Sequence, residues 1–155
     1  MSAREEGAPF SHVLCWVDGS DEACRAAKRA ANLAKSLGAN LSFVAIGKTQ
    51  GYDAGFDEYA RLERVSGPMP PLIDPAVDAC LRQAISISKK VGVSDAKQIV
   101  ISGDPTATIC EAAKSIGADL VVIGRHEASL VTRLLGTSVV DTLADRCQFA
   151  VLSVG

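Results

Sequence analysis

Apolar and polar positions along this chain follow two different periods, and the period changes repeatedly from strand-like to helix-like. Short continuous apolar runs predict buried strands, whereas apolar residues recurring every three or four positions predict helices with one buried face. The predicted strands cover residues 13–17, 41–46, 98–102, 120–123 and 149–154. Helices are expected at about 24–37, 77–91, 105–116 and 137–146.

Regular alternation of strands and helices is typical of an α/β domain with one parallel sheet and helices on both faces. The chain has 155 residues, of which 48% are apolar and 22% charged, so it fits a single domain over 1–155 with an ordinary core. Residues 1–10 are expected to be a flexible N-terminus. Open sheets of this class bind ligands at the carboxyl ends of their strands, where the strand order reverses.

The segment 47–76 breaks the pattern. It is a Gly- and Pro-rich connection that contains Gly51, Gly55, Gly67, Pro68, Pro70, Pro71 and Pro75, too many helix and strand breakers for continuous regular structure. A connection of this length is uncommon inside a compact domain. We expect it to pack over a face or an edge of the sheet, with a helical turn at 56–65. A role as a lid is a further alternative.

Two predicted helix-to-strand joints have similar sequences, namely Leu37-Gly-Ala-Asn-Leu and Ile116-Gly-Ala-Asp-Leu. In each, Gly is expected to adopt the left-handed helix cap, and Asn or Asp to start the following turn. The similarity indicates two similar βα units, although joints between helices and strands favour these residues in any case.

Charge and composition exclude several function classes. The net charge is −2 with no cluster of Lys or Arg, which argues against a nucleic-acid partner. No apolar segment reaches membrane-spanning length and the first nine residues are polar, so we expect no membrane partner and a cytoplasmic location. Sequence motifs for Ser-His-Asp, Cys-His or zinc chemistry are missing, and no catalytic or metal-binding residue is assigned.

The five cysteines are scattered, without metal-ligand spacing: Cys15, Cys24, Cys80, Cys110 and Cys147. An odd, unclustered count predicts reduced core thiols rather than a disulfide framework. A redox role for one of them stays open.

The last third of the chain contains the most informative stretch. The apolar run Leu120 to Ile123 ends in Gly124, a polar loop follows, and Gly136-Thr137-Ser138 opens an amphipathic segment. Where a strand is followed by a loop and then by the beginning of a helix, unpaired backbone N–H groups and the positive end of the helix dipole are exposed. This arrangement predicts a site for an anionic ligand.

Three stretches resemble the universal stress protein family, and the resemblance covers nearly the whole chain. Residues 13–20, Val-Leu-Cys-Trp-Val-Asp-Gly-Ser, are similar to the family's opening strand; Gly103-Asp104-Pro105 is similar to its third-strand exit, and residues 144–152 to its closing helix and strand. The resemblance implies a doubly wound, five-stranded parallel sheet in the order 3-2-1-4-5. It also implies a homodimer paired through the last strand, Phe149 to Val154.

Many members of that family bind ATP or another adenine nucleotide through a loop written Gly, two residues, Gly, nine residues, Gly, then Ser or Thr. Here Gly124 and Gly136-Thr137 occupy the first and last positions, but Glu127 replaces the middle glycine and the spacer has eight residues. The resemblance therefore implies a regulatory module that binds an adenine nucleotide, with or without Mg²⁺, and at most hydrolyses ATP slowly. The alternative is a dimeric partner-binding protein whose loop has decayed, because an inward Glu127 carboxylate would repel a phosphate.

By this resemblance the ligand contacts are Val17, Asp18, Ile46, Gly124, Arg125, His126, Gly136, Thr137 and Ser138. Asp18 accepts hydrogen bonds from the adenine or ribose, or is a helix cap or turn former ahead of Ser20, and the two roles are compatible. Ile46 is a wall for the base or plain core, and His126 contacts a phosphate or is solvated. Thr137 and Ser138 are helix caps or phosphate donors.

Overall fold

The computed structural model describes residues 9–47, 73–125, 143, 147 and 149–155. Five parallel strands form one sheet in the order β3-β2-β1-β4-β5. Their bounds are β1 His12–Trp16, β2 Asn40–Gly47, β3 Lys97–Ser102, β4 Leu120–Gly124 and β5 Ala150–Val154. The strand order implied by the resemblance is confirmed, and every predicted strand end lies within one residue of the observed one.

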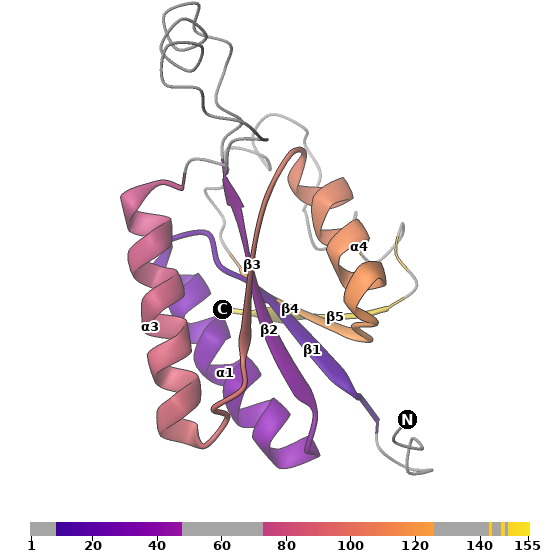
Figure 1. Cartoon of the computed structure of the whole chain (residues 1–155). Coiled ribbons are helices and arrows are strands. Elements are labelled where there is room, and N and C mark those ends of the chain that lie inside the picture. The colour runs from indigo at the N-terminus through magenta and orange to yellow at the C-terminus, as the bar shows by residue number, and fades with distance from the viewer. Residues whose placement is uncertain (1–8, 48–72, 126–142, 144–146, 148) are drawn as a thin grey trace, which may run out of the picture.

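Helices cover both faces of the sheet (Figure 1). Helix α1 (Asp21–Leu37) and helix α3 (Pro75–Val91) lie side by side on one face, and helix α4 (Pro105–Ile116) lies on the other. The expected fourth helix, 137–146, lies outside the described residues except for Leu143, which is buried. No helix in the described part of the chain is long and apolar enough to cross a membrane.

The Gly- and Pro-rich connection is shorter at both ends than the sequence predicts. Gly47 pairs with Ser102 as the last residue of β2, and Pro75 is the first residue of α3. Residues 48–72, including the expected helical turn at 56–65 and the lid, lie outside the described residues.

Helix α1 packs closely on the sheet through a stripe of small residues. Ser20 caps its start, accepting a hydrogen bond from the Ala23 N–H at 3.1 Å, and Lys35 lies in its last turn. The buried stripe consists of Ala23, Ala26, Ala27, Ala30, Ala31 and Ala34. Side chains of this size let the helix backbone approach the sheet, so the first turn of α1 comes close to the ends of the central strands.

The other two helices begin with the dipeptide Asp-Pro. Asp74 accepts a hydrogen bond from the Ala76 N–H at 2.8 Å, and Asp104 accepts one from the Ala107 N–H at 3.1 Å. Proline suits the first helical position because its missing N–H has no partner within the helix there. Two apolar clusters then fill the two faces of the sheet, with Phe43 and Leu81 among the residues on the α1 and α3 side and Leu14 and Ile109 among those on the α4 side.

The two joints of similar sequence differ in one respect. Gly38 and Gly117 both take the left-handed conformation expected of them, with φ of +64° and +71°. Asn40, however, is already paired within β2, whereas the Asp119 carboxylate accepts hydrogen bonds from the Ser11 N–H at 2.9 Å, the Ser11 hydroxyl at 3.0 Å and the His12 N–H at 3.0 Å. Asp119 therefore ties the start of β1 to the joint between α4 and β4.

Substituting Asp119 with Ala is expected to lower the free energy of unfolding by about 2 kcal/mol at pH 7, because three donor groups lose their hydrogen bonds to a charged acceptor. Partial burial alone would raise the pKa of Asp119, but the hydrogen bonds from His12 and Ser11 outweigh it and hold that pKa below the ordinary 3.8. The contribution of Asp119 is thus present above pH 3.8 and lost as the pH falls below it.

Urea unfolding at pH 7 and at lower pH measures this effect, with Asp95→Ala in an exposed loop as the control. Burial also lowers the pKa of His12, so the neutral imidazole is favoured in the folded state and stability falls further as the pH drops below 6.5. An Asp119→Ala protein as stable as the Asp95→Ala protein at pH 7 contradicts the assigned role.

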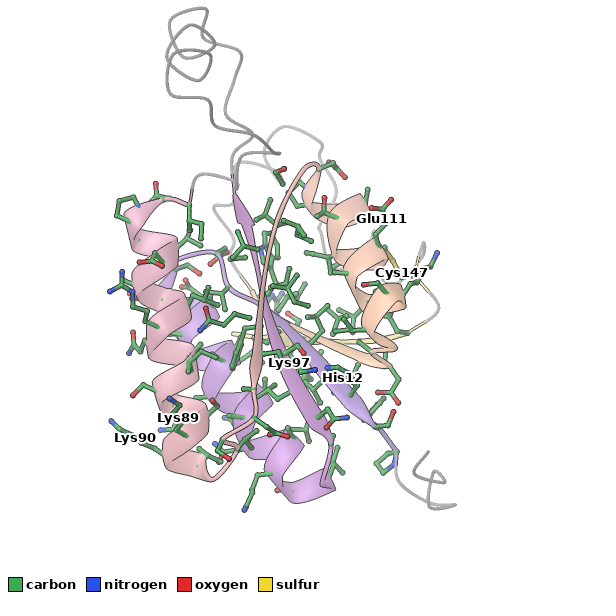
Figure 2. The ribbon with its side chains drawn as sticks, in the orientation of Figure 1. His12, Lys89, Lys90, Lys97, Glu111 and Cys147 are labelled. Atoms are coloured by element: carbon green, nitrogen blue, oxygen red, sulfur yellow. A yellow bond between two sulfur atoms is a disulfide. The ribbon has the colours of Figure 1, made fainter. Side chains whose placement is uncertain are left out.

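The expectation of reduced cysteines is wrong for one pair. Cys110 on α4 and Cys147 form a disulfide, with their Cα atoms 6.0 Å apart (Figure 2). The two residues are 37 positions apart in the sequence, and only the folding of the chain end back against α4 brings them together. The other three cysteines are free; Cys15 and Cys80 are buried, as expected of core residues, and Cys24 is partly exposed.

Candidate functional site

Five of the nine predicted ligand contacts lie at the carboxyl ends of the strands, where β1, β2 and β4 end. Val17 and Asp18 follow β1, Ile46 lies near the end of β2, Gly124 ends β4 and Arg125 follows it. The Val17 N–H donates to the Val44 carbonyl at 2.8 Å, which continues the pairing of β1 with β2. The strand order reverses between β1 and β4, which is where open sheets place ligands. We call these five residues the strand-end site.

The other four predicted contacts, His126, Gly136, Thr137 and Ser138, lie outside the described residues, as does Glu127. The geometry of the strand-end site therefore rests on the ends of the strands and on the turn that follows β1.

Asp18 is held in place by the turn that it forms. Its Oδ1 atom accepts hydrogen bonds from the Ser20 N–H at 2.9 Å and from the Ser20 hydroxyl at 2.5 Å. Ser20 in turn caps α1, so the carboxylate, the turn and the helix start form one connected unit. Asp18 therefore acts as the turn former that the sequence offered as its alternative role. The same bonds fix a partly exposed carboxylate at the end of β1.

Gly124 lies against the backbone of α1. A Cβ atom at this position would lie 2.7 Å from the Glu22 carbonyl carbon and 2.8 Å from the Ala23 nitrogen. Such contacts are too short for any side chain, so glycine is required by packing alone. Gly124 thus sets the distance between the end of β4 and the first turn of α1.

Arg125 brings positive charge to the same strand ends. Its backbone N–H donates to the Val154 carbonyl at 2.6 Å, which extends the pairing of β4 with β5, and its side chain is exposed. The position of the backbone is therefore fixed, while the guanidinium group extends into solvent near the strand ends. This is the only cation among the described residues of the predicted site.

Apolar side chains lie beside the site on the α4 face of the sheet. Trp16 and Ile46 are partly buried and pack against the apolar cluster that includes Leu14 and Val44. Alternate residues of a strand face the same side, so Trp16 follows Leu14 and Ile46 follows Val44 onto this face. Val17 is fully buried on the opposite face. The strand-end site therefore combines a fixed carboxylate, an arginine and an apolar surface.

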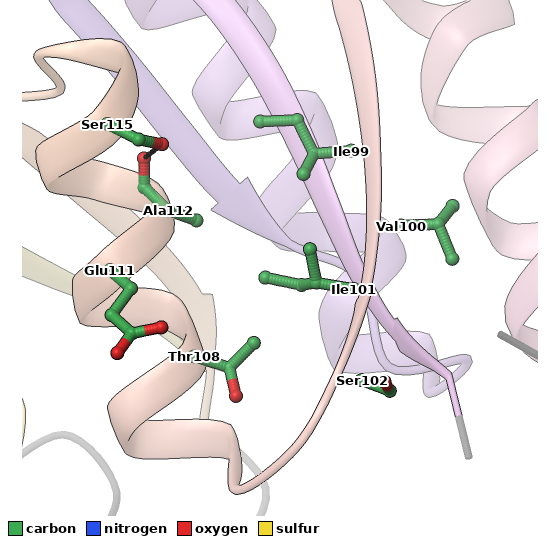
Figure 3. Close-up of a pocket in the computed structure, with 8 residues that line it drawn as sticks. All are labelled: Ile99, Val100, Ile101, Ser102, Thr108, Glu111, Ala112 and Ser115. Carbon is green, nitrogen blue, oxygen red and sulfur yellow. Dashed lines mark hydrogen bonds between the residues drawn. The ribbon is translucent and has the colours of Figure 1, made fainter. Parts of the chain in front are cut away.

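A groove of about 550 Å³ lies elsewhere, between β3 and α4 (Figure 3). Its lining residues are Ile99, Val100, Ile101, Ser102, Thr108, Glu111, Ala112 and Ser115. The sequence predicted the strand and the helix that carry them but assigned none of them to a site. In Figure 3 the Ile99 and Ile101 side chains point toward α4, and Val100 points away. The signal in the sequence was the spacing of Thr108, Glu111 and Ser115 on one helix face. The Thr108 and Ser115 hydroxyls donate to carbonyls of their own helical segment, so they are already satisfied.

The described residues hold no group of three or more His, Cys, Asp or Glu side chains that could bind a metal ion. His12 lies at the amino end of β1, away from the strand-end site, and its Nε2 atom is 2.8 Å from the Ser42 hydroxyl.

The sheet order and the helices on both faces define a doubly wound α/β domain. The model of the universal stress protein family matches residues 9–155, and the chain belongs to that family. A search of curated protein sequences finds no significant match.

Solved structures of the same family superpose over almost the whole chain. A universal stress protein crystallised in complex with cAMP is 26% identical, with a TM-score of 0.67 over 94% of this chain and 97% of that one. A family member from Burkholderia pseudomallei is also 26% identical, with a TM-score of 0.62 over 94% and 96% of the two chains. The Archaeoglobus fulgidus protein in complex with dAMP, at 19% identity, has a TM-score of 0.57 over 94% and 98%.

Proposed function

We propose that this protein is a regulatory module that binds an adenine nucleotide at the strand-end site. The observation that carries the proposal is the Asp18 carboxylate, which the bonds to Ser20 hold at the point where the strand order reverses. A fixed carboxylate there suits a ribose hydroxyl or an exocyclic amine, both of which are hydrogen-bond donors. The 26% identical relative in complex with cAMP supports an adenine nucleotide as the ligand class.

Within this proposal each residue has a distinct role. Trp16 and Ile46 offer an apolar surface to the base, and Asp18 accepts hydrogen bonds from the nucleoside. Arg125 attracts the phosphates, together with His126 and the Gly136-Thr137-Ser138 segment that the family resemblance assigns to them. Val17 contributes backbone only, because its side chain is fully buried. We further propose that the bound nucleotide acts as a signal, and we assign no catalytic residue.

Mass spectrometry of the small molecules released by denaturing freshly purified protein tests this function. The expected result is an adenine nucleotide recovered in an amount approaching one per chain. The Asp18→Ala protein, purified in the same way, should release much less. Recovery of a different class of compound from both proteins contradicts the proposal.

The alternative function, a partner-binding protein with a decayed loop, rests on Glu127. Substituting Glu127 with Gly is expected to tighten binding of ATP at least 10-fold and binding of adenosine by less than 2-fold, because only ATP carries phosphates that a carboxylate repels. Glu127→Gln is the matched control, since it removes the charge and keeps a side chain. Calorimetric titration of the three proteins gives the affinities. If ATP binds only to the Glu127→Gly protein, the decayed-loop alternative is correct.

We further propose that the protein forms a homodimer through β5. This strand is at the edge of the sheet, and its Leu152 is the one large apolar residue of the described chain that is markedly exposed, at 39%. An exposed edge strand offers unpaired backbone groups to a second copy. Leu152→Glu is expected to convert the dimer to a monomer in light scattering coupled to size-exclusion chromatography, because two buried carboxylates would face the interface. Lys97→Glu on the opposite edge strand is the control and should remain dimeric.

A further inference from the structure

Cys24 on α1 and Cys80 on α3 lie in contact at the surface between the two helices. Their Sγ atoms are 3.1 Å apart, although the residues are 56 positions apart in the sequence. Cys24 is partly exposed and its Sγ atom is also 3.6 Å from the Gln83 side-chain oxygen, an exposed contact. Cys80 is only 4% exposed. The pair therefore has one sulfur that solvent can reach and one directly behind it.

We propose that Cys24 and Cys80 are a thiol–disulfide exchange site that reacts with low-molecular-weight disulfides and reversibly links α1 to α3. A disulfide bond is about 2.05 Å long, so the two sulfur atoms need to approach by only about 1 Å. Neither function proposed above uses this pair, and the disulfide between Cys110 and Cys147 is separate from it.

The reaction has two steps. The Cys24 thiolate attacks one sulfur of glutathione disulfide; a mixed disulfide forms on Cys24, and one glutathione leaves as its thiolate. Cys80 then attacks the Cys24 sulfur and gives up its proton to solvent, and the second glutathione leaves as the Cys24–Cys80 bond forms. Two protein thiols are oxidised, and one glutathione disulfide is reduced to two glutathione molecules.

Burial sets the order of these steps. Desolvation raises the pKa of Cys80 to about 12, so this sulfur is not the first to attack. Once Cys24 carries glutathione, the Cys24 thiol no longer contributes to that raised pKa, and the Cys80 sulfur attacks within the molecule across a 3.1 Å contact. Cys15 is fully buried, and burial raises the pKa of its thiol still further. Cys15 is therefore the unreactive member of the three free cysteines and serves as the control.

The location links this chemistry to the strand-end site. The backbone of Gly19, in the turn between Asp18 and Ser20, lies near the Cys80 sulfur and acts to lower the pKa of that thiol, against the larger effect of burial. The same turn packs against the first turn of α3, since a Cβ on Gly19 would lie 3.2 Å from the Val77 nitrogen. A covalent link between α1 and α3 therefore forms next to the turn that holds Asp18.

Peptide mapping of the full-length protein tests the proposal. The protein is equilibrated with glutathione disulfide, the remaining thiols are alkylated, and trypsin digestion is followed by mass spectrometry. Trypsin leaves Cys15 and Cys24 in one peptide, because no Lys or Arg separates them. The Cys15→Ser protein is therefore mapped in parallel, so that a cross-link to the Cys80 peptide identifies Cys24 alone.

The expected product is a cross-linked pair of peptides lighter by two hydrogen atoms than the sum of the reduced peptides, formed equally in the Cys15→Ser protein and reversed by excess reduced glutathione. In the Cys24→Ser protein Cys80 should stay free, and in the Cys80→Ser protein Cys24 should retain glutathione. The cross-linked protein should melt several degrees higher, because the link closes a long loop. Three results would overturn the proposal. Cys24 and Cys80 could both remain free, glutathione could persist on Cys24 of the unsubstituted protein, or the cross-link could run through Cys15.

Discussion

Substituting Gly124 with Val should lower the free energy of unfolding by about 3 kcal/mol and the melting temperature by roughly 10 °C. The added Cβ would lie 2.7 Å from the Glu22 carbonyl carbon, and both that atom and the Ala23 nitrogen belong to the backbone of α1. A backbone cannot turn aside as a flexible side chain can, so the first turn of α1 has to move. Urea unfolding with two-state analysis measures the loss.

Gly117→Asn is the matched control for this substitution. Gly117 has no atom within 4 Å of an added Cβ, and Asn tolerates its left-handed conformation. This control should lose less than about 1 kcal/mol. A Gly124→Val protein as stable as the control would show that α1 and β4 are not held as closely as described.

Substituting Asp18 with Asn is expected to weaken binding of an adenine nucleotide between 10- and 100-fold, with little change in stability. The amide oxygen of Asn can still accept the hydrogen bonds of Ser20, so the turn and the cap of α1 are retained. A charged acceptor is lost for the nucleoside, and hydrogen bonds to charged groups contribute about 1.5–3 kcal/mol.

Asp21→Asn is the control for charge. Asp21 is exposed in the first turn of α1, and its substitution changes the net charge by the same amount. Calorimetry should show affinity within about 2-fold of the original protein, since charges exposed to solvent are screened. Equal losses of affinity in both variants would indicate a general electrostatic effect and would remove Asp18 from the site.

The apolar pattern was sufficient for the strands, and their order was implied by the resemblance to the family. Buried parallel strands are short apolar runs between turn residues, and a run as short as Leu41 to Ile46 differs clearly from the longer amphipathic pattern of a helix. The start of α3 was placed two residues late, at Val77 rather than Pro75, because the apolar period begins inside the helix while Asp74 and Pro75 set its first turn. The shared joint sequences were informative about Gly38 and Gly117, yet the different tasks of Asn40 and Asp119 depend on which backbone groups lie opposite them.

Contacts between distant segments were the main features that the sequence could not supply. No local pattern marks Cys110 as the partner of Cys147, or Cys24 as the neighbour of Cys80, because each pair meets only after the helices have packed. A second reason for a glycine at 124 likewise could not be predicted from the sequence. The family resemblance assigns Gly124 to the first position of a nucleotide loop, but its contact with the backbone of α1 requires a glycine with or without a ligand.

The central claim is tested most directly by calorimetric titration of the nucleotide-stripped protein with cAMP, AMP and ATP, with GTP as the comparison. We expect saturable binding of at least one adenine nucleotide near one per chain, much weaker binding of GTP, and loss of that binding in the Asp18→Asn protein. Flat titrations with all three adenine nucleotides would contradict the account and would leave the protein as a member of the family that acts without a nucleotide.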